Sequence, residues 1–316
     1  MIAHDVLTYV CARSLGFGPE MVKITPYSYG DVDRGPYNVR SAPEMREGEK
    51  PTVTGADPFY DENEYYSDFV PYTHPENGLV PAIEVLSLYS AEPDWGMDCG
   101  LTLSPLQKLT GGSQGYRHLR YGLFLLRAGV AHRRAVYFTE LARTAFLRED
   151  LYWGIRFSAR AIHYIEDILT PVHAKPFSEL YALKTLLCPK RLYSTAQNYH
   201  MNFEGYTAYR LWGGDPLFIT AIEQARPFAI SDLKKDLRAA SRTIRRLFYP
   251  IFRECRRLWG GSMERGPVKL LKADLKNIRP SERFDEGVTQ WLRISASFVK
   301  GYILRYPDGF LKARAR

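Results

Sequence analysis

Residues 150–174, DLYWGIRFSARAIHYIEDILTPVHA, combine an apolar helical stretch with several side chains that commonly bind metals. The apolar pattern predicts a helix over 150–169, which Pro171 should end or bend. His163 and Asp167 are four residues apart, so their side chains lie on one face of this helix. The bend at Pro171 lets His173 turn back toward the same space.

Helical periodicity continues along most of the chain after Gln114, and strand patterns are sparse. We therefore expect a mainly α protein, and its 316 residues suit a single domain, 1–316. Residues 24–76 are rich in Pro, Gly, Asp and Tyr without a period, which predicts a long irregular insertion. The predicted helices are 2–15, 78–90, 115–127, 131–147, 150–169, 177–187, 191–211, 216–226, 230–258 and 285–305.

Basic residues are concentrated in the last third of the chain. Residues 228–316 hold 21 Lys and Arg against 9 Asp and Glu, a net charge of +12, whereas the other residues carry −4. Arginines recur at helical spacing within 230–258, opposite a row of Leu and Ile, which predicts an amphipathic helix. This basic helical C-terminal part suits nucleic acid or an anionic membrane surface, or is a solvated helix face. The arginines are Arg238, Arg242, Arg245, Arg246, Arg253, Arg256 and Arg257.

Other features of the sequence exclude several classes of protein. No apolar run approaches the ~18–20 residues that span a bilayer, so no transmembrane segment is expected. The N-terminus lacks the basic flank and apolar stretch of a secretory signal, so we expect a cytoplasmic or already processed chain. The cysteines form no Cys-x-x-Cys pair, which argues against a thiolate zinc site. They are Cys11, Cys99, Cys188 and Cys255.

A second His and acid pair, His200 and Glu204, also stands four residues apart in a predicted helix. With His163, Asp167 and His173 it gives three imidazoles and two carboxylates on two helices. Zinc prefers such nitrogen and oxygen donors, and helical proteins build such sites from inward-facing residues of neighbouring helices. A lone His on an apolar helix face is more often a core residue, but the combination of both pairs favours a zinc site.

These segments resemble a known family. Residues 161–174, AIHYIEDILTPVHA, closely resemble the HYxxDxxxPxH segment of bacterial zinc-dependent phospholipases C, including the clostridial alpha-toxin type. Residues 199–204, YHMNFE, resemble that family's HxxxE segment, and the fungal single-strand-specific nucleases of the same superfamily share the pattern. The resemblance covers about 90–210, is faint at 1–16, and implies a phospholipase C/nuclease-like helical bundle with two to three zinc ions.

The resemblance also implies further ligands. The family's Pro-Asp-Tyr-like segment corresponds to Pro93-Asp94-Trp95, with Asp98 as the competing carboxylate, and two further ligands of the family correspond to His118 and His4. The implied ligands of one zinc are Asp94, His118, His163 and Asp167. Those of a second are His173, His200 and Glu204. Those of a third are His4, the N-terminal amine and Asp167, which would bridge two metals.

The chain departs from the family in three places. Family chains begin with Trp, whose amine and carbonyl bind metal, whereas this chain begins with Met, three residues before His4. The longer spacing from His173 to His200 implies an inserted helix near 177–187. Glu166 occupies a position that is usually small, either as an exposed residue or as an outer acceptor for a ligand His.

Zinc ions held close together suit phosphodiester hydrolysis, because zinc neutralises charge on the phosphate oxygens and lowers the pKa of a bound water toward ~7. We therefore expect a zinc-dependent phosphoric diester hydrolase of the phospholipase C type, in which a metal-bound water attacks phosphorus. Asp94 is the expected ligand and candidate base. Trp95 would face a choline-like head group, stack on a base, or form a wall of the cleft.

Two hypotheses compete with a phospholipase C-like enzyme that cuts phospholipid. A single-strand nuclease would use the basic last third, because phosphate contacts supply most non-specific affinity for nucleic acid. A non-catalytic zinc-binding protein would hold the metal in a closed site, but such sites are usually rich in Cys. Aromatic residues within 24–76 could form an interfacial flap on a membrane, although the acidic residues between them would be repelled by an anionic surface.

Overall fold

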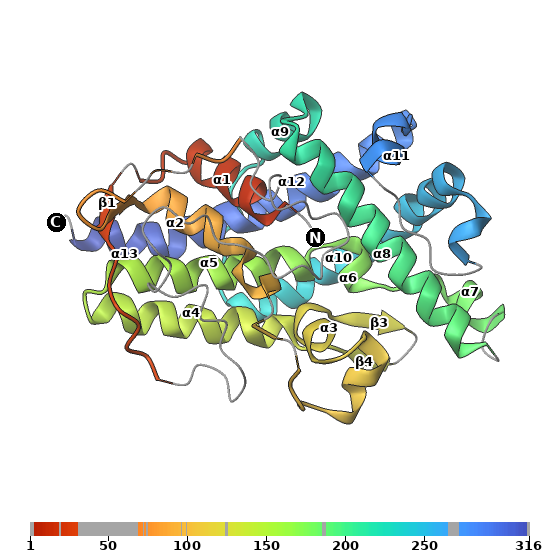
Figure 1. Ribbon diagram of the computed structural model, residues 1–316, viewed down its shortest axis with the longest axis horizontal. Coiled ribbons are helices and arrows are strands. Elements are labelled where there is room, and N and C mark those ends of the chain that lie inside the picture. The colour runs from red at the N-terminus through yellow and green to blue at the C-terminus, as the bar shows by residue number, and fades with distance from the viewer. Residues whose placement is uncertain are drawn as a thin grey trace.

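One central helix, α5 (Leu151–Ile168), organises the fold. The computed structural model describes residues 3–18, 20–30, 69–71, 73, 75–95, 97–98, 100–123, 126–184, 188–264 and 272–314. In these residues the protein is mainly helical, which confirms the predicted fold class (Figure 1). Most of the predicted irregular insertion lies outside the described residues, so its conformation stays a prediction.

Helix α5 is buried at every position from Tyr152 to Ile168, because its surface is apolar on all sides except for one polar stripe. The carboxylate of Asp150 accepts a hydrogen bond from the backbone N–H of Trp153 and caps the helix. The neighbouring α4 (Ala131–Leu147) is joined to α5 by a short turn, and the two helices lie side by side (Figure 1). A short connection of this kind favours antiparallel neighbours.

The other elements surround this pair. Helix α5 also contacts α1 (His4–Ser14), α2 (Ala82–Leu88), the 3₁₀ helix η2 (Tyr89–Trp95) and α12 (Glu282–Arg305). Strand β1 (Met21–Lys23) pairs antiparallel with β2 (Leu79–Pro81), which is distant in the sequence, and β3 (Tyr121–Leu123) forms a hairpin with β4 (Leu126–Ala128). The remaining helices are η3 (Pro105–Thr110), α3 (Ser113–His118), α6 (Pro171–Ala174), α7 (Glu179–Lys184), α8 (Pro189–Trp212), α9 (Pro216–Glu223), α10 (Leu233–Trp259), η4 (Gly261–Glu264), α11 (Lys272–Asn277) and α13 (Pro307–Arg314).

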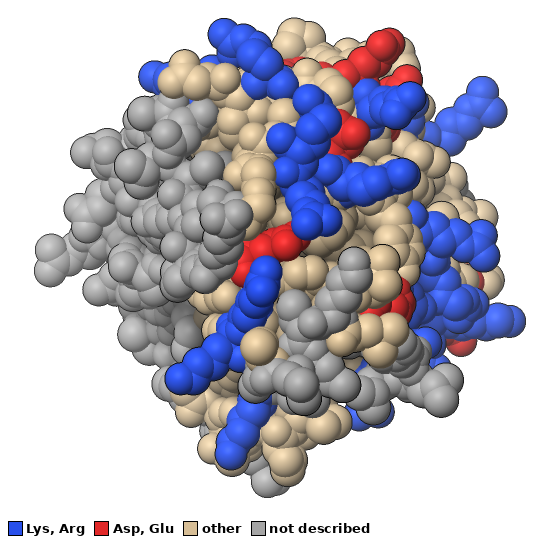
Figure 2. All heavy atoms as spheres, turned by 90° about the vertical axis from the view of Figure 1, so that its right-hand side faces the viewer, with Lys and Arg blue, Asp and Glu red and all other residues tan. Residues whose placement is uncertain are grey.

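Helix α10 has the predicted amphipathic character. Its Leu233, Leu237, Ile244, Leu247 and Ile251 are buried, whereas the predicted arginines are exposed or half-buried. Figure 2 views the end of the molecule that carries α7 and the β3–β4 hairpin, and shows Lys and Arg side chains over much of this face. Among the described residues, no helix is long and apolar enough to cross a membrane.

The helix predicted over 115–127 is wrong. Helix α3 ends at His118, and the chain then forms the β3–β4 hairpin. Two glycines explain the difference: Gly129 has φ +97°, where a Cβ would overlap the carbonyl of Leu119, and a Cβ at Gly122 would overlap the guanidinium of Arg245. Neither restriction is visible in the apolar periodicity, because the second depends on α10.

The other boundaries differ less. The helix predicted over 78–90 begins as strand β2, continues as α2 and is followed by η2, so Glu92 and Asp94 lie in a 3₁₀ helix. Helix α7 begins at Glu179, two residues later than predicted, and residues 185–187 of the predicted helix lie outside the described residues. The sequence patterns missed α6, α11 and α13, which are too short for periodicity to identify.

A buried ionic group attaches η2 to α5. Both oxygens of Glu92 accept hydrogen bonds from the guanidinium groups of Arg156 and Arg160 at 2.7–3.2 Å, and all three side chains are fully buried. Burial by itself would raise the pKa of Glu92, but the two arginines outweigh it and lower the pKa to about 2. Glu92 is therefore charged at neutral pH and holds η2 against α5.

Candidate metal centre

The candidate ligands lie on the same stripe of α5 as this ionic group. Arg156, Arg160, His163 and Asp167 follow one another at spacings of four, three and four residues, which places them on one face of the helix. That face contacts η2. The pairing of Glu92 with the two arginines therefore places Asp94, two residues later, beside His163.

Four atoms from three elements, α3, α5 and η2, form donor set A. They are His118 Nδ1, His163 Nε2, Asp94 Oδ1 and Asp167 Oδ2. The two nitrogens are 2.9 Å apart, Asp167 Oδ2 lies 3.0 and 3.2 Å from them, and Asp94 Oδ1 lies 3.4 and 3.8 Å from them. Ligands bound tetrahedrally to one zinc at 2.0–2.2 Å lie about 3.4 Å from one another. Donor set A therefore has the spacing of a tetrahedral metal site.

Donor set B consists of His173 Nε2, His200 Nε2 and Glu204 Oε1. The two nitrogens are 2.9 Å apart, and Glu204 Oε1 lies 2.6 Å from His173 and 3.1 Å from His200. Helix α6, which begins at Pro171, turns His173 back toward α8, which carries the other two residues. The three side chains can hold a metal ion with one position left for another ligand.

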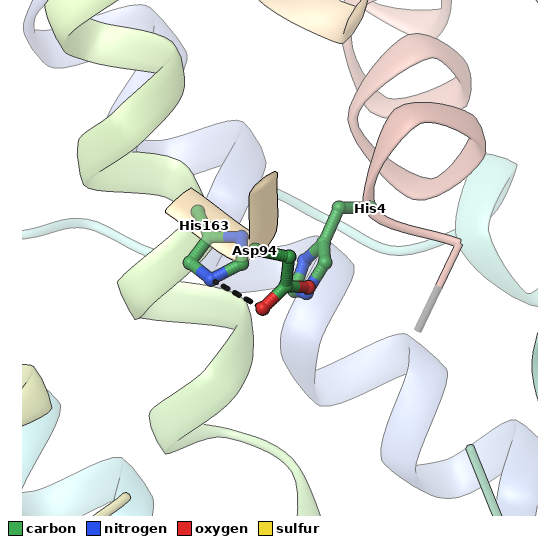
Figure 3. Close-up of side chains that lie close together, drawn as sticks. All are labelled: His4, Asp94 and His163. Carbon is green, nitrogen blue, oxygen red and sulfur yellow. Dashed lines mark ion pairs between the residues drawn. The ribbon is translucent and has the colours of Figure 1, made fainter. Parts of the chain in front are cut away.

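Donor set C is formed by His4 Nε2, Asp94 Oδ2 and Asp167 Oδ1. The nitrogen lies 3.8 Å from each of the two oxygens. Figure 3 shows how His4 from α1 and His163 from α5 approach Asp94 from two sides. Asp94 and Asp167 thus each direct one oxygen to set A and the other to set C. The N-terminal amine belongs to Met1 and lies outside the described residues.

The second nitrogen of each histidine in sets A and C faces an oxygen atom. His163 Nδ1 lies 2.8 Å from the carbonyl of Ser90, His118 Nε2 lies 3.1 Å from Asp98 Oδ2, and His4 Nδ1 lies 2.6 Å from Glu166 Oε2. Such contacts fix the ring orientation and direct the other nitrogen to a metal. The Ser90 carbonyl carries no signal in the sequence, because any residue supplies one.

The structure separates the roles of the two competing carboxylates. Asp94 is 17% exposed and faces the histidines of sets A and C. Asp98 is fully buried, contacts the outer nitrogen of His118, and is engaged by Arg117 and Tyr164. The geometry therefore favours Asp94 as the ligand and Asp98 as the acceptor that orients His118.

The electrostatics of the centre match a cation site. Burial would raise the pKa of Asp167, but His163, His173 and His118 lower it well below its ordinary value. Burial would lower the pKa of His173, but Asp167 and Glu204 raise it to about 10. The carboxylates around His173 thus hold a proton on its imidazole, and a metal ion would replace that proton. Asp167 Oδ2 and His173 Nδ1 are also buried without a hydrogen bond of good geometry.

All eight predicted metal ligands lie in these three donor sets. Glu166 is 1% exposed, so the exposed alternative is wrong, and its contact with His4 Nδ1 leaves the outer-acceptor alternative as the prediction. Its second oxygen accepts a hydrogen bond from Thr8 Oγ1 at 2.9 Å, which fixes the carboxyl beside His4. Trp95 belongs to η2, but its side chain lies outside what the structure describes, so its role stays a prediction.

Replacing Glu166 by Gln is expected to weaken metal binding at set C by about 10- to 100-fold and to leave sets A and B loaded, because only His4 loses its carboxylate partner. Elemental analysis after dialysis against graded zinc would measure this. The matched control is Glu84→Gln, a buried glutamate that accepts hydrogen bonds from Thr73 away from the centre. Equal metal content in the Glu166→Gln variant and the wild type would show that Glu166 does not position His4.

Comparison of the chain with known protein families, curated proteins and solved structures gives no match. The class defined by the fold and the site is therefore a mainly α protein whose buried His, Asp and Glu groups can hold metal ions.

Proposed function

We propose that this protein is a zinc-dependent phosphodiester hydrolase of the phospholipase C-like kind. The observation that carries the proposal is the sharing of Asp94 and Asp167 between donor sets A and C, beside donor set B. Shared carboxylates hold metal ions close together, and closely spaced metals are typical of enzymes that cleave phosphate esters. A closed structural zinc site would use cysteines and would not share ligands.

Zinc is the metal that the donor chemistry favours. The sets combine imidazole nitrogens with carboxylate oxygens and contain no thiolate, which suits Zn²⁺ better than Ca²⁺ or Mg²⁺. A bound zinc ion supplies a Lewis acid for the phosphate and lowers the pKa of a water molecule. The resemblance of residues 161–174 and 199–204 to zinc-dependent phospholipases C agrees with this choice.

The exposure of the ligand side chains indicates the side from which a substrate would approach. Asp94 is 17% exposed and His200 is 22% exposed, whereas the side chains of the other ligands are at most 6% exposed. A phosphodiester would therefore enter on the side of Asp94 and His200. Asp94 is the ligand best placed to accept a proton there, because the remaining carboxylates are enclosed by histidines.

The test is the metal content of the chain together with its activity. We expect two to three zinc ions per chain and hydrolysis of a chromogenic phosphodiester that is lost on chelation and restored by zinc. Zinc uptake should also release protons, measurable by calorimetry in buffers of different ionisation enthalpy, because His173 is protonated in the metal-free centre. Fewer than two zinc ions, with no chelator-sensitive hydrolysis, would refute the proposal.

A single-strand nuclease is the second candidate, because α10 carries several exposed arginines. The same assay with an oligonucleotide at low and high salt distinguishes the two. Nuclease activity should fall steeply with salt, since affinity would come from phosphate contacts. Cleavage of the oligonucleotide that does not change with salt would count against this candidate.

A further inference from the structure

The β3–β4 hairpin separates the metal centre from a second group of charged residues. Successive side chains of an extended strand point to opposite faces. A Cβ added at Gly122 would overlap Nη1 of Arg245, so this face of the strand is turned toward α10 and the side chain of Tyr121 points the opposite way. The backbone N–H of Arg120 donates to the carbonyl of His173 at 3.1 Å and holds the hairpin against the centre.

Arginines from the hairpin and from α10 meet on the face that is turned toward α10, beside a histidine of α4. We call the group the arginine cluster; it consists of Arg120, Arg127, Arg238, Arg242, Arg245 and His132. At Gly122, an added Cβ would overlap Nη1 of Arg245 and would lie 3.3 Å from Nη1 of Arg127, so two guanidinium groups approach one point. Arg238 Nη2 lies 3.4 Å from His132 Nε2.

Four arginines of this cluster form no ion pair with a carboxylate among the described residues: Arg120, Arg238, Arg242 and Arg245. Burial and then Arg120 and Arg238 lower the pKa of His132 to about 3. Positive charges that lie close together repel one another, so the arrangement is costly without an anion.

Several polar atoms of the cluster also lack a hydrogen-bond partner. Nη1 of Arg120, Nε of Arg238 and Nδ1 of His132 are buried, and none of them makes a hydrogen bond within the described chain. His132 is only 6% exposed and lies in the first turn of α4, where the helix dipole favours negative charge. Buried polar groups are normally satisfied, so these atoms point to a ligand that accepts several hydrogen bonds.

We propose that the arginine cluster is a phosphate-binding site that is separate from the metal centre. A tetrahedral oxyanion accepts hydrogen bonds from several guanidinium groups at once and neutralises their mutual repulsion. The phosphate group comes either from a small phosphate in solution or from the headgroup of a lipid. This site does not depend on the proposed hydrolase activity, because none of its residues belongs to donor sets A, B or C.

The test is binding of inorganic phosphate to the full chain at constant ionic strength, with zinc and again with a chelator. Phosphate bound at a metal would be lost with the chelator, whereas phosphate bound at the cluster would remain. We expect the Arg238→Gln/Arg245→Gln variant to raise the chelator-resistant Kd by about tenfold or more, which corresponds to about 1.4 kcal/mol.

The matched control is the Arg246→Gln/Arg253→Gln variant, which removes the same charge from exposed positions of the same helix. Its Kd should change less than about twofold, since exposed single charges contribute little. Equal weakening in both double variants, or no chelator-resistant binding in the wild type, would overturn the proposal. The melting temperature of the Arg238→Gln/Arg245→Gln variant should be no lower than that of the wild type. Arg242→Gln, at an exposed position, is a second variant for which we expect a smaller rise in Kd.

Vesicles identify the source of the phosphate. If the site binds a lipid headgroup, the protein should sediment more strongly with vesicles that contain phosphatidic acid than with phosphatidylglycerol vesicles. This preference should be lost in the Arg238→Gln/Arg245→Gln variant and kept in the Arg246→Gln/Arg253→Gln control. Phosphate binding without this preference assigns it to a small phosphate in solution. If the chain holds no zinc, the proposed function fails, but the comparison between the two double variants remains valid.

Discussion

The Asp167→Asn variant is expected to lose more than one metal ion and to hydrolyse a phosphodiester at least about 100-fold more slowly than the wild type. In the wild type, the two carboxylate oxygens of Asp167 face different histidines. Oδ2 lies 3.0 Å from His118 Nδ1 in set A, and Oδ1 lies 3.8 Å from His4 Nε2 in set C. Asparagine replaces one oxygen by an NH₂ group, which donates hydrogen bonds and does not bind metal. The expected loss of metal is larger than for substitution of a residue that only orients a ligand, because two donor sets share this side chain.

Elemental analysis and the chromogenic assay measure both parts of this prediction. Asp5→Asn is the matched control, because Asp5 is a buried aspartate beside His4 that accepts a hydrogen bond from Trp212 and faces none of the donor sets. This variant should keep its full metal content. Loss of a single metal ion from the Asp167→Asn variant would refute the bridging role, and loss of none would refute set A as well.

The Glu92→Gln variant is expected to lower the free energy of unfolding by about 3–5 kcal/mol. Glu92 is the carboxylate partner of Arg156 and Arg160, and the side chains of both arginines are 0% exposed. Without the carboxylate, two guanidinium charges remain buried next to each other, and neither can reach water. Because Glu92 also fixes η2, the variant should bind metal less tightly through Asp94. Urea denaturation measures the first effect and zinc titration the second.

An exposed ion pair of the same length provides the comparison. Arg13 and Glu223 are 2.7 Å apart, but their side chains are 45% and 42% exposed. Glu223→Gln should therefore cost less than about 1 kcal/mol. If Glu92→Gln and Glu223→Gln lowered the free energy of unfolding by similar amounts, burial would not strengthen the interaction of Glu92 with its arginines.

The effect of Glu92 should also depend on pH. Its pKa is lowered from 4.5 in the unfolded chain to about 2 in the folded protein, so its contribution to stability is fully present above pH 4.5. The contribution is lost as the pH falls from 4.5 toward 2. The difference in unfolding free energy between the wild type and Glu92→Gln should decrease over this interval, and a constant difference would contradict the assigned pKa.

The helical character of the chain follows from local sequence. Residues 131–147 and 150–169 are predicted within one residue of α4 and α5 because long apolar periods and short turns specify such helices directly. The hairpin at 121–128 could not be predicted this way. Its strands are short, its apolar pattern also fits a helix, and the contact of Gly122 with Arg245 of α10 joins positions more than a hundred residues apart.

Residue type and spacing identified His163, Asp167, His173, His200 and Glu204 in the sequence, whereas Asp94, His118 and His4 were implied only by the family resemblance. Of the groups that orient the histidines, Glu166 was predicted as one of two alternatives. The carbonyl of Ser90, the orienting role of Asp98 and the ionic group around Glu92 were not predicted, because they come from distant segments and have ordinary residue types.

The segment 150–174 by itself determined a buried helix, the pairing of His163 with Asp167 on one face, and a turn at Pro171 that returns His173 to that face. Only the tertiary structure decided that Asp94 rather than Asp98 faces the histidines, that Asp94 and Asp167 serve two donor sets, and that arginines from the hairpin and α10 form one cluster. Spacing along a helix fixes which side chains share a face, but the packing of separate elements fixes which faces meet.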